Sequence, residues 1–123
     1  MAGFERIEDI QAWQKSRTLT RDVFKLFQGT SLEREYTLKN QITRSTLSIM
    51  NNIAEGFGRY SDREFFRFLD IAKASGVETL SMLYVLLDLG KLTNDSFKDL
   101  YKRVDEVISM IAGLQRHLKQ SMR

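Results

Sequence analysis

The sequence contains no proline among its 123 residues, although average usage of about 5% would give about six. Proline breaks helix interiors but is common in long loops and at sheet edges. The chain also has only seven glycines and little of the Asn-Gly or Asp-Gly chemistry of tight hairpins. No segment of any length alternates with the period of a strand. These features predict long helices joined by short connections.

Apolar residues recur with helical spacing in four segments, which we expect to form helices over residues 9–27, 33–57, 62–89 and 94–120. Gly29 and Gly90 follow the first and third segments, where glycine readily takes the left-handed conformation that ends many helices. Matched helices with short connections predict an all-α fold, an antiparallel up-down-up-down four-helix bundle, as one domain over 1–123. The second and third helices carry apolar residues on more than one side, which predicts contact with another subunit.

Composition excludes several classes of site. The chain has no cysteine, so disulfides and thiolate metal sites are excluded, and its one histidine, His117, rules out histidine clusters. We therefore expect no metal and no cofactor. The N-terminus lacks a signal-peptide pattern, and the longest apolar run, Met82–Leu87, is far shorter than the ~20 residues of a membrane span. These features predict a cytoplasmic protein with no membrane partner.

The stretch NNIAEGFGRYSDREFF (51–66) comes close to a dinucleotide-binding loop, because Gly56, Gly58 and Ser61 differ by one residue from a G-x-G-x-x-G pattern. Such a loop must follow a β-strand and open a helix. The residues before this stretch have the apolar spacing of a helix instead of a strand. No Gly-Lys-Ser/Thr follows, so the stretch also lacks the pattern of a P-loop, which binds nucleoside triphosphates. The glycines therefore favour a helix–helix connection.

A corner between the second and third helices explains more of these residues. Gly58 would take the C′ position after the second helix, and Ser61 would cap the third helix. Glu64 lies three residues after Ser61, as in a capping box, and Tyr60 with Phe65 has the spacing of a hydrophobic staple. A cap of this kind contributes about 1 kcal/mol.

The corner does not explain Gly56, which lies inside the second predicted helix. Glycine in a helix interior lowers the stability of the helix by about 1 kcal/mol relative to alanine. Glu55 and Arg59 lie one helical turn apart with the acid first, the favourable order for an ion pair. A small residue and a charge pair near a helix end favour close packing against another helix or subunit over a ligand site.

The run NQITRSTLSIMNNIAEGFGRYSDREFFRFLDIAKASGVETLSMLYVLLDLGKL (40–92), with WQKS at 13–16, resembles the four-helix-bundle proteins encoded by intervening sequences in bacterial 23S ribosomal RNA genes. The segment Asn-Ile-Ala-Glu-Gly at 52–56, with Gly-Arg at 58–59, carries the resemblance most specifically. The chain departs from the family pattern at Thr43, where a second arginine is usual. The motif positions to which the resemblance gives structural or interface roles are Asn52, Glu55, Gly56, Gly58, Arg59, Ser75 and Glu78.

The resemblance implies a homopentamer of bundles. It also implies similarity to the accessory variability proteins of diversity-generating retroelements, which are basic pentamers that bind nucleic acid and a reverse transcriptase. The cellular role of the intervening-sequence proteins themselves is undefined. The resemblance therefore implies fold and assembly, with nucleic acid or a nucleic-acid-binding protein as the expected partner.

The chain is mildly basic, with a net charge of +3. Residues 91–123 carry seven basic and four acidic residues, the largest excess along the chain. The candidates for phosphate contacts are Arg17, Arg21, Lys25, Arg44, Arg59, Lys98, Lys102, Arg116 and Lys119. The alternative is that these residues form a solvated surface with interspersed acids, and we favour this alternative for a single chain. Five copies would carry a charge of +15 in total, which would strengthen the positive electrostatic potential at the surface.

No arrangement of nucleophile, base and orienting group is visible in the sequence. His117 stands between basic residues near the end of the fourth helix, where a surface position is expected. We therefore expect no catalytic residues and a non-enzymatic, oligomeric protein that binds RNA, DNA or a ribonucleoprotein. The alternative is a structural scaffold that binds another protein through an apolar patch and does not bind nucleic acid.

Overall fold

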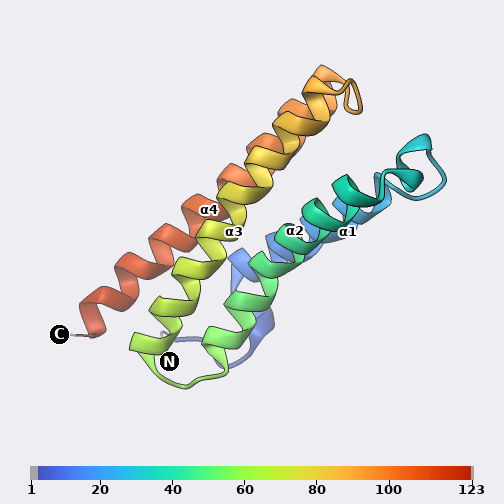
Figure 1. The fold of residues 1–123 in the computed structure, drawn as a ribbon. Helices are drawn as coiled ribbons and strands as arrows, with labels where there is room; N and C mark the ends of the chain where they lie inside the picture. The colour runs from blue at the N-terminus through green and yellow to red at the C-terminus, as the bar shows by residue number, and fades with distance from the viewer. Residues whose placement is uncertain (1–2, 123) are drawn as a thin grey trace.

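The structure is a computed structural model and describes residues 3–122. It contains four long helices and two short 3-10 helices: η1 (Ile7–Asp9), α1 (Gln11–Lys25), η2 (Ser31–Arg34), α2 (Tyr36–Phe57), α3 (Asp62–Asp88) and α4 (Asn94–Ser121). Consecutive long helices run antiparallel (Figure 1), and the described residues contain no strand. The predicted all-α up-down-up-down bundle is confirmed.

Two helix starts differ from the prediction. The helix expected from residue 9 begins at Gln11, because the Asp9 carboxylate accepts hydrogen bonds from the backbone amides of Glu5 and Arg6 and closes η1 instead. The helix expected from residue 33 begins at Tyr36. The Thr30 hydroxyl accepts a hydrogen bond from the amide of Leu32, so residues 31–34 form a separate turn. The other ends fall within two residues of the prediction.

The core consists of two apolar clusters, one toward each end of the bundle. The cluster at the end with the α2–α3 connection includes Ile53, Phe65 and Ile111. The cluster at the opposite end, which has the α1–α2 and α3–α4 connections (Figure 1), includes Phe27, Ile42 and Leu86. Both clusters draw on all four long helices, so each helix presents an apolar face inward as its periodicity predicts.

Small and hydroxyl-bearing residues line the contact between α2 and α3. Thr79 donates a hydrogen bond of 2.9 Å to Ser45, and the hydroxyl oxygens of Ser48 and Ser75 lie 2.9 Å apart. At Gly56, an added Cβ would lie 2.8 Å from Cβ of Phe68. The structure thus shows the close helix–helix contact that was expected at this glycine.

The α2–α3 corner has the predicted position but differs in detail. Ser61 caps α3 and accepts a hydrogen bond from the Glu64 amide at 3.3 Å. The Glu64 carboxylate binds Arg67 instead, at 2.9 Å, so the capping box was wrong in its second half. Gly58 is the last residue of the helical path, with φ −71°, and Tyr60 takes the left-handed conformation, with φ 54°. Tyr60 is 83% exposed, so the predicted staple is also wrong.

Two kinds of site find no support in residues 3–122. No helix there is long and apolar enough to cross a membrane. No three histidine, aspartate or glutamate side chains gather in a way that would hold a metal ion.

Candidate nucleic-acid interface

Charge is unevenly divided between the two halves of the bundle. Helices α1 and α2 together contain six basic and two acidic residues, a net charge of +4. Helices α3 and α4 contain eight basic and nine acidic residues, a net charge of −1. The excess counted over 91–123 depends on Lys91 and Arg123, which lie outside α4, and Arg123 also lies outside the described residues. The basic surface therefore belongs to α1 and α2 rather than to α4.

Arg17, Arg21 and Lys25 form an exposed stripe along α1. They are separated by four residues, which is a rise of about 6 Å per step. The Arg17 guanidinium lies 5.8 Å from the centre of the Trp13 ring, a cation–π distance. Lys15 lies outside this stripe because its amine binds Glu106 of α4 at 3.3 Å.

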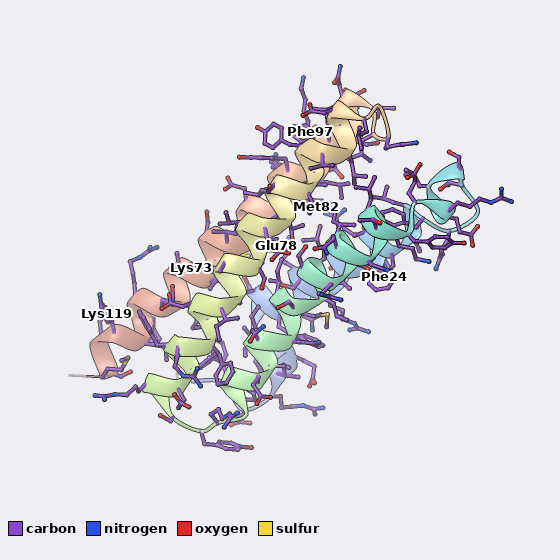
Figure 2. All side chains as sticks on the ribbon, viewed as in Figure 1. Phe24, Lys73, Glu78, Met82, Phe97 and Lys119 are labelled. Carbon is purple, nitrogen blue, oxygen red and sulfur yellow. The ribbon has the colours of Figure 1, made fainter. Side chains whose placement is uncertain are left out.

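The outer face of α2 continues this surface. Arg44 is exposed and lines an open hollow of about 530 Å³ together with Phe24 of α1 and Leu47. Figure 2 shows Phe24 on the α1–α2 side of the molecule. Asn40 and Asn51 line the same hollow. We call the surface of Arg17, Arg21, Lys25, Arg44 and this hollow the α1–α2 basic face.

The acids of α1 and α2 are both held by cations. Asp22 accepts hydrogen bonds from Arg21 at 3.0 Å and from Arg103 at 2.9 Å. These two hydrogen bonds hold the pKa of the Asp22 carboxyl below its ordinary value, and the bond from Arg21 has the larger effect. Glu55 binds Arg59 at 2.7 Å.

Three cations of this face, in contrast, lack an ion pair within residues 3–122: Arg17, Lys25 and Arg44. Free guanidinium and ammonium groups can contact phosphate without first breaking a salt bridge. The face is therefore positive both in total charge and in available groups.

The four candidates on α4 are exposed but lie in two places. They are Lys98, Lys102, Arg116 and Lys119. Asp95, Asp99, Asp105 and Glu106 surround Lys98 and Lys102, whereas Arg116 and Lys119 lie toward the end of α4 that is far from the α3–α4 connection, where Figure 2 labels Lys119. The contact between α1 and α4 is itself occupied by opposite charges, Arg103 with Asp22 and Lys15 with Glu106. The candidate cations of α4 therefore do not form one continuous basic surface with those of α1 and α2.

Most of the family-motif residues lie along the contact between α2 and α3. Asn52 donates to the Ser48 backbone and hydroxyl oxygens, and Ser48 contacts Ser75. Arg59 lies 5.1 Å from the centre of the Phe68 ring and binds Glu55, with both charged side chains about half exposed. Arg59 is therefore committed to contacts within the chain.

The other motif residues fill simpler roles. Gly56 is buried against α3, Gly58 ends α2, and Glu78 is exposed on α3. His117 is exposed on α4.

Sequence reasoning did not select Phe24, Asn40 or Asn51. One signal was present, because Asn40, Arg44, Leu47 and Asn51 follow one another at steps of four, three and four. That spacing places them on one face of a helix. A face of amides, one arginine and one leucine has too little apolar character to be recognised as core.

The comparisons agree with this fold. The family described as 23S rRNA-intervening sequence protein matches residues 8–113. A solved structure from Bacteroides thetaiotaomicron VPI-5482, a protein with unknown function from the S23 ribosomal protein family, is similar with a TM-score of 0.78. It is 23% identical, and the similarity covers 85% of this chain and 95% of that chain. No curated protein matches the chain.

Proposed function

Because the chain belongs to the family of 23S rRNA-intervening sequence proteins, we propose that it is a non-enzymatic, oligomeric bundle that binds RNA, DNA or a ribonucleoprotein through the α1–α2 basic face. The observation that carries this proposal is the +4 charge of α1 and α2 against −1 for α3 and α4. Basic groups that neutralise phosphates release counterions, which gives affinity without sequence preference. The unpaired cations of the face suit that role.

Binding of a labelled RNA measured at several salt concentrations tests the proposal. Replacing Arg17, Arg21 and Arg44 with glutamine should weaken binding. It should also flatten the salt dependence by about 0.7–0.9 units of log–log slope for each phosphate that the variant no longer neutralises. The matched control also removes three charges, by replacing Lys98, Lys102 and Arg116 with glutamine, and should change binding less. Equal effects of the two sets would contradict the assignment to α1 and α2.

Self-association is the second part of the proposal and involves a different surface. The outer side of α3 exposes four large apolar residues, Ile71, Val77, Tyr84 and Val85, and Leu89 directly follows the helix; each is 36–58% exposed. Glu78 and Asp88 are exposed among them, so this side of the molecule is mixed, but exposed apolar residues that gather on one helix often mark contact sites. The family resemblance implies five subunits, which would carry +15 in total.

Light scattering tests the assembly directly. A mass well above 14.4 kDa at micromolar concentration is expected, and Val77→Asp should lower it because a charge enters the apolar contact. A 14.4 kDa species for the unmodified protein would contradict self-association.

The same α3 surface also supports a second candidate function, a scaffold that binds another protein and no nucleic acid. In that case RNA affinity would be absent at every salt concentration. Val77→Asp would then disrupt binding of the partner protein, while charge variants of α1 and α2 would have no effect.

A further inference from the structure

The hollow on the α1–α2 basic face combines apolar and polar walls. Its volume is about 530 Å³, within the range of small-molecule sites. The side chains of Phe24 and Leu47 line it and remain 37% and 38% exposed. A partly exposed aromatic ring among cations offers a flat apolar surface on which a planar group can stack.

Two amides at the hollow have free hydrogen-bonding capacity. Asn40 and Asn51 are exposed, seven residues before and four residues after Leu47 on the same face of α2. Within residues 3–122 neither side chain makes a hydrogen bond, whereas Asn52 nearby is occupied by Ser48. An asparagine side chain has both a donor and an acceptor, which is the pattern that pairs with the edge of a nucleobase.

Cations adjoin the hollow where a phosphate backbone would pass. Arg44 lines it directly, and Arg17 and Arg21 lie on the neighbouring surface of α1. The acids of these two helices, Asp22 and Glu55, are already bound by arginines. The hollow therefore has a positive surround and no free carboxylate from α1 or α2.

We infer that this hollow holds an unpaired nucleobase, so that the α1–α2 basic face binds single-stranded nucleic acid in preference to duplex. The inference rests on the proposed nucleic-acid binding and names its substrate class. Single-strand sites combine a positive surface along the backbone with aromatic rings on which bases stack. In a duplex the base faces are already stacked, so Phe24 cannot reach them and only the cations contribute.

Fluorescence anisotropy with a labelled single-stranded RNA of about 12 nucleotides, and with a duplex of the same length, tests this inference. Phe24→Ala should weaken single-strand binding by roughly 10- to 100-fold and change duplex binding little. Its salt dependence should stay the same, because no cation is removed. The double variant Asn40→Ala with Asn51→Ala loses the amides that would contact the edge of the base. The difference in affinity between oligoadenylate and oligouridylate should therefore be smaller for this variant than for the unmodified protein.

Two controls distinguish the loss of base stacking from a failure to fold. Phe24→Tyr should retain most single-strand affinity, and Tyr60→Ala, which removes an exposed aromatic outside the hollow, should leave it unchanged. Thermal melting shows whether Phe24→Ala still folds, and Asn40→Ala with Asn51→Ala gives a second, solvent-exposed test. Equal affinity for single strand and duplex, with no effect of Phe24→Ala, overturns the inference but leaves the proposed function intact. No binding to either nucleic acid overturns both.

Discussion

Replacing Gly56 with alanine adds one methyl group to the closest contact between α2 and α3. The new Cβ would lie 2.8 Å from Cβ of Phe68, 3.0 Å from Cδ1 of Phe65 and 3.2 Å from the Phe65 carbonyl oxygen. Phe68 Cβ and the Phe65 carbonyl sit on or next to the backbone of α3, and Phe65 is fully buried. A rotamer change cannot relieve contacts of this kind, so the two helices must move apart.

Two effects of opposite sign determine the change in the free energy of unfolding. Alanine is better than glycine in a helix interior by about 1 kcal/mol, which stabilises the variant. Overpacking a close-packed contact typically costs about 1–3 kcal/mol, and two rigid neighbours within about 3 Å place this site toward the upper part of that range. We expect Gly56→Ala to lose about 1–2 kcal/mol in total.

The matched control is Gly58→Ala, two residues later. Gly58 has φ −71°, and a Cβ there would meet only backbone oxygens at 3.5 and 3.6 Å. Reduced freedom of the unfolded chain should stabilise this variant by up to about 1 kcal/mol. Urea denaturation of the two variants and the unmodified protein measures both changes. If Gly56→Ala is as stable as Gly58→Ala, the argument for close packing is refuted.

Four further variants test the corner and the ion pairs. Ser61→Ala should cost about 0.5–2 kcal/mol through loss of the α3 cap, and its urea midpoint should not respond to added nucleotide, which a phosphate loop would require. Glu55→Ala and Arg59→Ala should each cost only about 0–1 kcal/mol in the isolated chain, because both side chains are half exposed. A double-mutant cycle with a coupling of several kcal/mol would contradict that exposed geometry. Asp22→Asn should destabilise the protein by up to about 1 kcal/mol at pH 7, because Arg21 and Arg103 lower the carboxyl pKa. A lowered folded pKa stabilises the protein above the ordinary value near 4 and loses that effect as pH falls through the folded pKa. The gap between Asp22→Asn and the unmodified protein should therefore close below about pH 4, and thermal melts across pH that show a constant gap would disprove it.

The sequence predicts the bundle well because helix length, apolar period and short connections are all local properties. Gly29 and Gly90 take the expected positive φ, and Ser61 caps α3 as predicted. The starts of α1 and α2 were predicted too early because Asp9 and Thr30 accept hydrogen bonds from nearby backbone amides and so create competing 3-10 turns. Likewise, Glu64 has Arg67 one turn away, and a charged partner competes successfully with a backbone amide.

The candidate site was harder to predict because it depends on which helices are neighbours. Counting charges by sequence segment favoured residues 91–123, whereas counting by helix places the excess on α1 and α2. The ion pair of Asp22 with Arg103 joins residues 81 positions apart, and nothing local reveals that this acid is neutralised. The hollow at Phe24 and Leu47 is likewise formed by two helices, so only the fold brings its walls together.

The hydroxyl pairs between α2 and α3 fix how these two helices can move. A slip of one helical turn, about 5.4 Å, would separate Ser45 from Thr79 and Ser48 from Ser75 and so break both hydroxyl contacts between the helices. Ser45 and Thr79 would keep only their bonds to carbonyl oxygens of their own helices. The α2–α3 hairpin should therefore behave as a single rigid body, and its central amides should exchange with solvent deuterium only when the whole chain unfolds. Helix α1 has no such hydroxyl pair to another helix within residues 3–122, and its buried hydroxyls, Ser16 and Thr20, bond to their own backbone. Partial opening of the bundle is then expected to begin with α1, the helix that carries the exposed basic stripe.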